Sequence, residues 1–552
     1  MLKKFLLHRI NFTNKKPNSS LLILLLKKIN IMQPNRIYLC LFFMLIFISC
    51  KKNILEPTPL STEVVSTQTI DDLIYKSTID VGGFDWNNAD EKIVWSALNH
   101  SDNIMSIGFK PAGIFFDINK IHEIDVRESA WQNAKNKLLY EILKLEIELD
   151  SSVTLKKIIP WDEHFLPVID VVIKNPKTIL WLRKSELVRY AEPMGYEPRN
   201  LIFNNFKKEN NTNNAITSRS GCNENNAETG LMANNDYINL TPAAKQSWNY
   251  QYHNIPKAWT KSTGTGVKVF FIDTGCEFEQ ENLGTSFNQG YSVGRTIEKI
   301  VTLPRSTFLG INTGPIETAD DGCGHGTSMA GACAAPRGVD ANTVGVAYNC
   351  NLVTCRAAED VFIEDSREAK GVADAFTNAA NRTDVKIISM SLGRVTTSSQ
   401  IRDAIAFAYG KGKLIFCAAG TSFSWTSGWY GVIFPATLPQ VNAVTGVYEN
   451  DFNTSCASCH DGAETDFTVV MEKSTNAKFP LSLAMQGNIP SIVGGSSVST
   501  ATAAGIAALV WGRFPTLSRD AILNKLIQSS SNYPVRNAQL GWGNINADMA
   551  TN

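Results

Sequence analysis

The stretch that decides the fold runs Gly494-Gly495-Ser496-Ser497-Val498-Ser499-Thr500-Ala501-Thr502-Ala503-Ala504-Gly505. Two glycines lead into a run of small residues, which predicts a closely packed helix beginning near Ser497. A helix N-terminus leaves its first N–H groups unpaired and carries partial positive charge. A serine there has its own N–H directed at any oxyanion that forms when its hydroxyl attacks a carbonyl. Taken alone, the stretch favours a closely packed helix without a catalytic role, so other segments must decide whether Ser497 is reactive.

Two further segments carry the residues that a reactive serine would need. The strand predicted over 267–272 is followed by Asp273, an acid at the carboxyl end of a buried strand, where open α/β sheets place their sites. His325, one of only seven histidines, lies between glycines at the start of a small-residue helix. A carboxylate can accept the Nδ1–H of a histidine, and glycines permit the close backbone approach that a general base needs. Each segment alone also suits a structural role.

Together the three segments resemble the subtilisin-like serine proteases, whose triad follows the chain order Asp, His, Ser. The resemblance covers roughly Trp248 to Ala550. It implies that Asp273 orients, that His325 is the base and that Ser497 is the nucleophile. It also implies an edge that pairs with an extended peptide, a pocket wall opposite it and a residue at the pocket base. The edge is Ser391, Leu392 and Gly393, the opposite wall is Ala418, Ala419 and Gly420, and the residue at the pocket base is Ile433.

Two departures from the family pattern concern the oxyanion and the pocket. Thr421 stands where the family has an asparagine that donates its amide to the oxyanion. Losing such a donor in subtilisin costs about 2.7–4 kcal/mol of transition-state stabilisation. We expect Thr421 Oγ1, or a water that it holds, to replace the amide in a slower enzyme. The β-branched Ile433 predicts a shallow pocket and a preference for small or medium apolar residues before the cleaved bond.

The predicted elements after Gly266 alternate between strands and helices. Strands are expected at 267–272, 352–355, 385–390, 413–418, 441–447 and 467–471, and helices at 326–334, 366–380, 399–410, 497–511 and 518–528. Such alternation predicts an α/β layer with a mainly parallel sheet. The resemblance implies a subtilisin-like three-layer domain, which we assign to residues 246–552.

The region before this domain has a different pattern. Residues 51–200 read as strand, helix, strands, helix and strand, the order of a small α+β ferredoxin-like sandwich. By the resemblance, this is an inhibitory propeptide that assists folding, blocks the cleft and is cut away. Residues 201–245 are rich in asparagine and poor in apolar side chains. They predict an exposed linker, where proteolytic cleavage concentrates.

The N-terminal residues 1–50 predict export. Arg36 precedes an apolar run, 37–48, that is short for a bilayer span but suits a signal peptide. Ser49 and Cys50 resemble the end of a bacterial lipobox, so we expect lipidation of Cys50, with an ordinary cleaved signal as the alternative. Met32 offers an alternative start. The protein is expected outside the cytoplasm, either anchored to the membrane of the cell envelope or secreted.

Charge and cysteine content limit the partners and cofactors. Lys+Arg and Asp+Glu each number 52, which argues against a nucleic-acid partner. Setting aside Cys40 and Cys50 leaves an odd number of the eleven cysteines, which in an oxidising compartment predicts some disulfides and at least one free thiol. The sequence leaves the pairing open. The chemistry requires no cofactor, and structural calcium, common in the family, has no assignable ligands.

One cysteine motif needs separate treatment. Cys456-Ala457-Ser458-Cys459-His460 matches the haem c attachment pattern. These residues fall on a loop before a predicted strand, and a covalent haem needs a pocket. We therefore favour a local disulfide or free thiols.

These observations predict a serine endopeptidase that hydrolyses peptide bonds in proteins or peptides through an acyl-enzyme. It is expected to carry its own propeptide as an intramolecular inhibitor. One alternative is an inactive homologue that binds peptides along the same edge strand. The other is an envelope haem protein.

Overall fold

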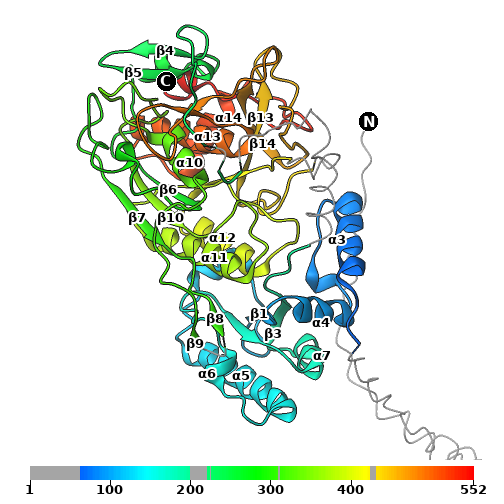
Figure 1. Ribbon diagram of the computed structural model, residues 1–552. Helices are drawn as coiled ribbons and strands as arrows, with labels where there is room; N and C mark the ends of the chain where they lie inside the picture. Colours follow the sequence, from blue (N-terminus) through cyan, green and yellow to red (C-terminus); the bar gives the residue numbers. More distant parts are fainter. Residues whose placement is uncertain (1–62, 199–220, 224, 309–310, 423–430) are drawn as a thin grey trace, which may run out of the picture. The chain divides into compact units, whose positions relative to one another are not determined.

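The computed structural model describes residues 63–198, 221–223, 225–308, 311–422 and 431–552 (Figure 1). The expected signal region, with Met32 and Cys50, lies outside the described residues, as does the first part of the predicted linker. No helix within the described part of the chain is long and apolar enough to cross a bilayer.

A seven-stranded sheet forms the middle layer of the larger region, in the order β14-β13-β12-β11-β6-β10-β7. All its neighbouring strands pair in parallel, as predicted. The strands are β6 Lys268–Asp273, β7 Ile297–Val301, β10 Asn351–Arg356, β11 Ile387–Met390, β12 Leu414–Ala418, β13 Asn442–Tyr448 and β14 Thr465–Glu472. The sequence analysis missed β7 because this edge strand is half-exposed along its length and lacks a buried run.

Helices cover both faces of this sheet (Figure 1). They are α10 His325–Ala334, α11 Ser366–Asn381, α12 Ser399–Gly410, α13 Gly495–Arg513 and α14 Arg519–Gln528. Alternate residues of β6 face opposite sides, as strand geometry requires. Val269 and Phe271 pack with α10 and α13, whereas Phe270 and Ile272 pack with α11 and α12. The three-layer α/β fold is therefore as predicted.

Helix α13 lies close to its neighbours because its side chains are small. Its first seventeen residues, Gly495 to Trp511, are all buried. A Cβ on Gly505 would lie 2.7 Å from the Val346 Cβ, so only glycine fits there. The run of small residues from Gly494 to Gly505 is thus required for close packing along most of the helix.

The N-terminal region is a small α+β unit with its own apolar core. Its elements are α3 Thr67–Val81, α4 Glu91–His100, β1 Ile104–Phe109, α5 Ser129–Leu149, α6 Leu155–Ile158, β2 Val168–Val172, α7 Pro176–Lys184 and β3 Val188–Pro193. The strands form an antiparallel sheet in the order β2-β1-β3. A ferredoxin-like sandwich has a fourth strand, but here β2 alone lies between α5 and α7. Helices α3 and α4 were not anticipated.

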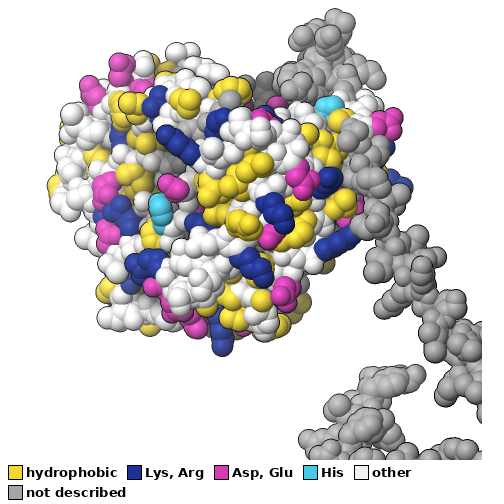
Figure 2. Space-filling model, turned by 90° about the horizontal axis from the view of Figure 1, so that it is seen from below, with side chains coloured by type: hydrophobic (Ala, Val, Ile, Leu, Met, Phe, Trp, Pro, Cys, Tyr) yellow, Lys and Arg dark blue, Asp and Glu magenta, His cyan; other side chains and the backbone are white. Residues whose placement is uncertain are grey.

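The chain from residue 221 onward differs from the predicted linker. Cys222 is joined by a disulfide to Cys323, and a hairpin follows. The short elements of the larger region are β4 Tyr237–Leu240, β5 Ala244–Ser247, α9 Ile255–Ala258, β8 Thr307–Phe308, β9 Ile311–Asn312, β15 Leu481–Ser482, β16 Ser491–Ile492 and α15 Ala547–Ala550. On the face seen in Figure 2, basic and acidic side chains are interspersed among apolar ones, in keeping with their equal numbers.

Candidate active site

Asp273 and His325 meet between the end of β6 and the start of α10. The Nδ1 atom of His325 lies 2.7 Å from Oδ1 of Asp273, and both residues are at most 2% exposed. Gly326 permits this approach, because a Cβ there would lie 2.3 Å from the Gly275 carbonyl oxygen. Backbone packing therefore fixes the pair.

The surroundings of His325 favour its charged form. Burial alone would lower its pKa, but the charge and hydrogen bond of Asp273, together with the charges of Asp321 and Asp360, outweigh burial and raise the pKa above 6.5. Within the described residues, Nε2 of His325 has no hydrogen-bond partner. Asp273 therefore holds Nδ1, and Nε2 remains available for a further partner.

Asp321 ties the loop before α10 together, a role that the sequence analysis did not assign. Its Oδ1 accepts hydrogen bonds from Gly324 N–H at 2.7 Å and from Thr274 Oγ1 at 2.8 Å. Its Oδ2 accepts from the N–H and the hydroxyl of Thr327. These bonds satisfy N–H groups at the start of α10. An acid shortly before a helix start was the available signal.

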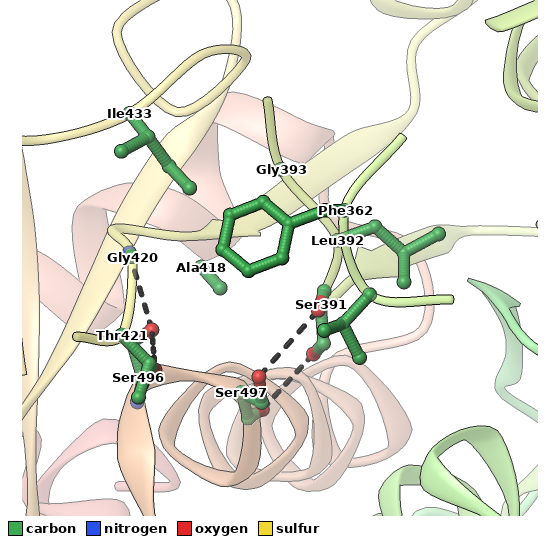
Figure 3. Close-up of a pocket in the computed structure, with 11 residues that line it drawn as sticks. Phe362, Ser391, Leu392, Gly393, Ala418, Gly420, Thr421, Ile433, Ser496 and Ser497 are labelled. Carbon is green, nitrogen blue, oxygen red and sulfur yellow. Dashed lines mark hydrogen bonds between the residues drawn. The ribbon is translucent and has the colours of Figure 1, made fainter. Parts of the chain in front are cut away.

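Ser497 lies in the first turn of α13, beside the residues that follow β11 (Figure 3). Its Oγ is 3.5 Å from the Ser391 carbonyl oxygen, and the Ser391 hydroxyl donates to the Ser497 carbonyl at 3.0 Å. Ser497 Oγ is not hydrogen-bonded to His325 Nε2 in this structure. Catalytic hydrogen bonds are often long or absent without substrate.

A pocket with a volume of about 20 Å³ opens beside Ser497. It is lined by Val361, Phe362, Ser391, Leu392, Gly393, Ala418, Gly420, Thr421, Ile433, Ser496 and Ser497 (Figure 3). All the residues predicted for substrate binding are in the lining except Ala419. The Ala419 carbonyl instead accepts a hydrogen bond from the Ile433 N–H at 2.9 Å. A volume of this size holds about one water molecule.

Val361 and Phe362 were missed by the sequence analysis. Phe362 forms a parallel bridge with Gly393, and the Gly393 N–H donates to the Val361 carbonyl at 3.1 Å. This pairing extends the predicted peptide-binding edge by a second segment. No local sequence pattern pointed to it, because the pairing joins residues about thirty positions apart.

Ile433 makes the pocket shallow. A Cβ on Gly393 would lie 2.2 Å from Ile433 Cδ1, and a Cβ on Gly420 would lie 3.2 Å from Ile433 Cγ1. Its side chain therefore occupies the space between the two pocket walls. Figure 3 shows Ile433 directed towards the Phe362 ring.

The Thr421 hydroxyl faces Ser496. Its Oγ1 accepts from Ser496 N–H at 3.1 Å and lies 3.0 Å from Ser496 Oγ. Ser496 Oγ in turn accepts from Gly420 N–H at 3.1 Å. The residue expected near the oxyanion is therefore connected to the one that precedes Ser497.

The described cysteines include both disulfides and free thiols, as expected. Cys456 is bonded to Cys459, so neither thiol of the C-x-x-C-H motif is available to attach a haem. The free thiols are all buried: Cys276, Cys333, Cys350, Cys355 and Cys417. In the part of the chain that the structure describes, no group of three or more His, Cys, Asp or Glu side chains could hold a metal ion, and we assign no calcium ligands.

The fold and this geometry define the class of protein, a serine peptidase built on a parallel α/β sheet. Residues 264–543, just over half of the chain, match the Subtilase family (Peptidase_S8). Subtilisin DY of Bacillus licheniformis is 30% identical over 297 residues, which are 52% of this chain and 91% of the relative. Thermitase of Thermoactinomyces vulgaris is 25% identical over 283 residues, 51% of this chain and 88% of the relative.

Among solved structures, the MycP3 protease from the type VII (ESX-3) secretion system is similar at 21% identity and a TM-score of 0.44. The match covers 61% of this chain and 93% of that one. The sequence comparisons carry the assignment. The chain belongs to the subtilase family of subtilisin-like serine endopeptidases.

Proposed function

We propose that this protein is an exported serine endopeptidase in which Asp273, His325 and Ser497 form the catalytic triad. The observation that carries the proposal is the buried 2.7 Å contact between His325 and Asp273, which leaves Nε2 of the imidazole available. Ser497, in the first turn of a helix, supplies both a hydroxyl and an N–H at the positive end of that helix.

Each residue has a defined step. Ser497 Oγ attacks the scissile carbonyl carbon while its proton moves to His325 Nε2. Asp273 stabilises the imidazolium through Nδ1, and the Ser497 N–H binds the oxyanion. His325 then gives its proton to the leaving amine, and water hydrolyses the acyl-enzyme by the reverse route.

Thr421 is proposed as a second oxyanion donor, directly or through a water. Ser496 Oγ already accepts from Gly420 N–H, so its own proton is free to point at Thr421 Oγ1. In that arrangement Thr421 Oγ1 accepts from Ser496 twice, and its hydroxyl proton remains free for the substrate. A hydroxyl has a shorter reach than a carboxamide, so we expect a slower enzyme than one with asparagine here.

The proposed substrates are extended peptides with a small or medium apolar residue before the cleaved bond. Ser391, Leu392 and the segment beginning at Val361 line the pocket, and they are proposed to pair with such a peptide. The small volume beside Ser497, which Ile433 limits, supports the size preference.

The N-terminal region is proposed to be an inhibitory propeptide, and its end supports this role. Tyr196 N–H donates to the Glu364 carbonyl at 3.0 Å, directly beyond the segment that pairs with Gly393. A peptide of the chain itself therefore lies against the edge proposed for substrates. Cleavage is proposed within the predicted linker, after the N-terminal region.

Charged contacts support the same assignment. Arg189 and Asp403 form a buried ion pair with a distance of 2.6 Å. Glu192 accepts a hydrogen bond from Ser399 N–H at the start of α12. Burial raises the pKa of Glu192 to about 7, and the hydrogen bonds from Ser399 oppose this shift only in part. Both contacts join the N-terminal region to helix α12.

Export and anchoring are proposed from the sequence. Ser49 and Cys50 follow a signal-like apolar run, and lipidation of Cys50 would attach the chain to a membrane of the cell envelope. The two disulfides among the described residues agree with an oxidising compartment.

A fluorophosphonate probe tests the proposed function. We expect it to label Ser497 in the processed chain and to leave Ser497→Ala unlabelled. Mass spectrometry of the processed N-terminus in both proteins would show whether maturation is autocatalytic and which bond is cut. A correctly processed wild-type chain that is not labelled would favour the inactive peptide-binding alternative.

A further inference from the structure

A loop that contains the C-x-x-C-H motif lies behind one wall of the pocket. We name residues 456–460 the bracing segment and residues 420–422 the wall segment. Backbone contacts join the two: an antiparallel bridge between Cys459 and Thr421, a 3.0 Å hydrogen bond from His460 N–H to the Gly420 carbonyl, and a 2.6 Å hydrogen bond from Ser422 N–H to the Ser458 carbonyl. Every residue of the wall segment is therefore in contact with the bracing segment.

The His460 side chain binds the end of the wall segment. Its Nε2 lies 2.8 Å from Ser422 Oγ. Ser422 directly follows Thr421 in the chain, and His460 is only 1% exposed. A buried imidazole therefore holds the residue next to the proposed oxyanion donor.

Gly420 makes this contact possible. Its φ is +124°, and a Cβ there would lie 2.5 Å from Nδ1 of His460. The Gly420 N–H also donates to Ser496 Oγ at 3.1 Å. Direct contacts therefore run from His460 through Gly420 to the residue immediately before Ser497.

Two hydrogen bonds fix the disulfide-closed bracing segment to the central sheet. Cys456–Cys459 closes a short loop directly before His460. Cys456 N–H donates to the Gly446 carbonyl in β13 at 2.9 Å, and Ala457 N–H donates to Glu472 Oε2 in β14 at 2.9 Å. The imidazole is thus mounted on two strands of the sheet.

His460 is suited to holding its neighbours and not to moving protons. Burial lowers its pKa to about 4, so the imidazole is neutral near pH 7. A neutral imidazole donates from one nitrogen and accepts at the other. Its Nε2 can therefore serve the Ser422 hydroxyl, as donor or as acceptor, at any pH well above 4.

We propose that His460, mounted on the Cys456–Cys459 disulfide, is a positioning residue that keeps Gly420 and Thr421 in the geometry that binds the oxyanion. This inference rests on the proposed peptidase function. Without the imidazole, the Ser422 hydroxyl loses this partner and the wall segment can shift. A misplacement of about 1 Å can cost about a hundredfold in rate, so the turnover number should fall more than substrate binding.

The test compares two buried histidines in the processed full chain. His460→Ala removes the brace, and His460→Gln keeps a side chain that can donate and accept. His253→Ala is the matched control, because His253 is also fully buried, also has its pKa lowered to about 4, and also forms hydrogen bonds through its ring, with Ile545 and Val470. Active sites are counted by fluorophosphonate titration, and kcat and KM are measured well below the melting temperature of each variant.

We expect His460→Ala to lower kcat per active site by about tenfold or more, with a smaller change in KM. His460→Gln should recover part of the loss, and His253→Ala should keep the wild-type kcat despite its lower stability. Equal kcat values for His460→Ala and His253→Ala would overturn the proposal. If His460→Ala does not fold, the Cys456→Ser/Cys459→Ser protein takes its place, and a wild-type kcat per active site in that protein would overturn the proposal. A wild-type protein without a titratable Ser497 would instead overturn the proposed function.

Discussion

Thr421 and Ser496 are joined by two contacts, one from the Ser496 N–H to Thr421 Oγ1 at 3.1 Å and one between their hydroxyl oxygens at 3.0 Å. The pocket wall and the start of α13 therefore form one hydrogen-bonded unit. A change on either side is transmitted to Ser497, because Ser496 is its neighbour in the chain.

Thr421→Ala should slow the chemical step. The substitution removes the proposed oxyanion donor and leaves the buried Ser496 N–H without its acceptor, which costs about 1–3 kcal/mol. We expect kcat to fall by about tenfold to a hundredfold, measured with a peptide anilide at saturating concentration. Thr421→Ser keeps the hydroxyl and should retain most of the rate. An unchanged kcat in Thr421→Ala, with Ser497→Ala inactive, would remove Thr421 from the mechanism.

Ile433→Ala should widen the specificity of the pocket. The isoleucine side chain lies between Gly393 and Gly420, so shortening it frees space for a larger substrate residue. We expect kcat/KM for a peptide with phenylalanine before the cleaved bond to rise relative to one with alanine, in a library that varies only this position. Ile433→Val, which removes one methyl group, should give an intermediate ratio. A wild-type preference for arginine or phenylalanine would contradict the shallow pocket.

The pH profile should follow the protonation of His325. The base must be neutral to accept the Ser497 proton, and its pKa is raised above 6.5 because Asp273, Asp321 and Asp360 outweigh the effect of burial. We therefore expect kcat/KM to increase with pH through a midpoint above 6.5. Asp360→Asn removes one of these charges and should move the midpoint to lower pH. A midpoint that does not move would show that Asp360 has no influence on the imidazole.

Release of the N-terminal region should depend on Asp170. One oxygen of this buried carboxyl has no partner within the described residues, and the other accepts from Gln400 Nε2 at 3.2 Å. Burial raises its pKa to about 7, against the opposing charge of Lys370 and with smaller contributions from Glu163 and Asp374. Once separated, the carboxyl would face water and return towards its usual pKa of 3.8.

The associated state therefore holds a proton that the separated state releases. Association should be strongest below about pH 4 and should weaken as the pH rises through 7, by up to about tenfold per pH unit for each such carboxyl. Glu192, whose pKa burial also raises to about 7, contributes in the same direction. The measurement is the rate at which activity appears after cleavage of the linker, between pH 5 and pH 8. Asp170→Asn should reduce this slope and leave the part that Glu192 contributes. If the Asp170→Asn protein has the same slope as the wild type, another group causes the pH dependence.

The Cys222–Cys323 disulfide should stabilise the histidine loop. The two cysteines are 101 positions apart, and Cys323 lies two residues before His325. Closing a loop of about 100 residues stabilises a fold by about 4.7 kcal/mol on a chain-entropy estimate. We expect the Cys222→Ser/Cys323→Ser protein to unfold at a lower denaturant concentration and to lose activity before it unfolds. Cys355→Ser, which replaces a buried free thiol, is the control. If the Cys222→Ser/Cys323→Ser protein and the wild type unfold at the same denaturant concentration, the disulfide does not have this stabilising role.

The sequence was most informative where local pattern and chemistry coincide. Asp273 was predicted because a buried apolar strand ends in an acid, and α12 was predicted with its observed bounds because its apolar residues repeat with a helical period. Asp321, Phe362 and the partner of Cys222 were not predicted. Their roles depend on contacts between residues that are distant in sequence, and a single sequence carries no record of such contacts.

The two disulfides of the described residues both lie beyond residue 221, so the N-terminal region is held to the sheet domain by noncovalent contacts and by the chain itself. Cutting the predicted linker before Cys222 would turn a tethered inhibitor, present at an effective concentration of roughly millimolar, into a free one whose occupancy falls on dilution. If Cys50 carries the lipid, the anchor departs with the inhibitor. The same cut that activates the peptidase would then set it free to diffuse, so the membrane would be its place of storage and not its place of action.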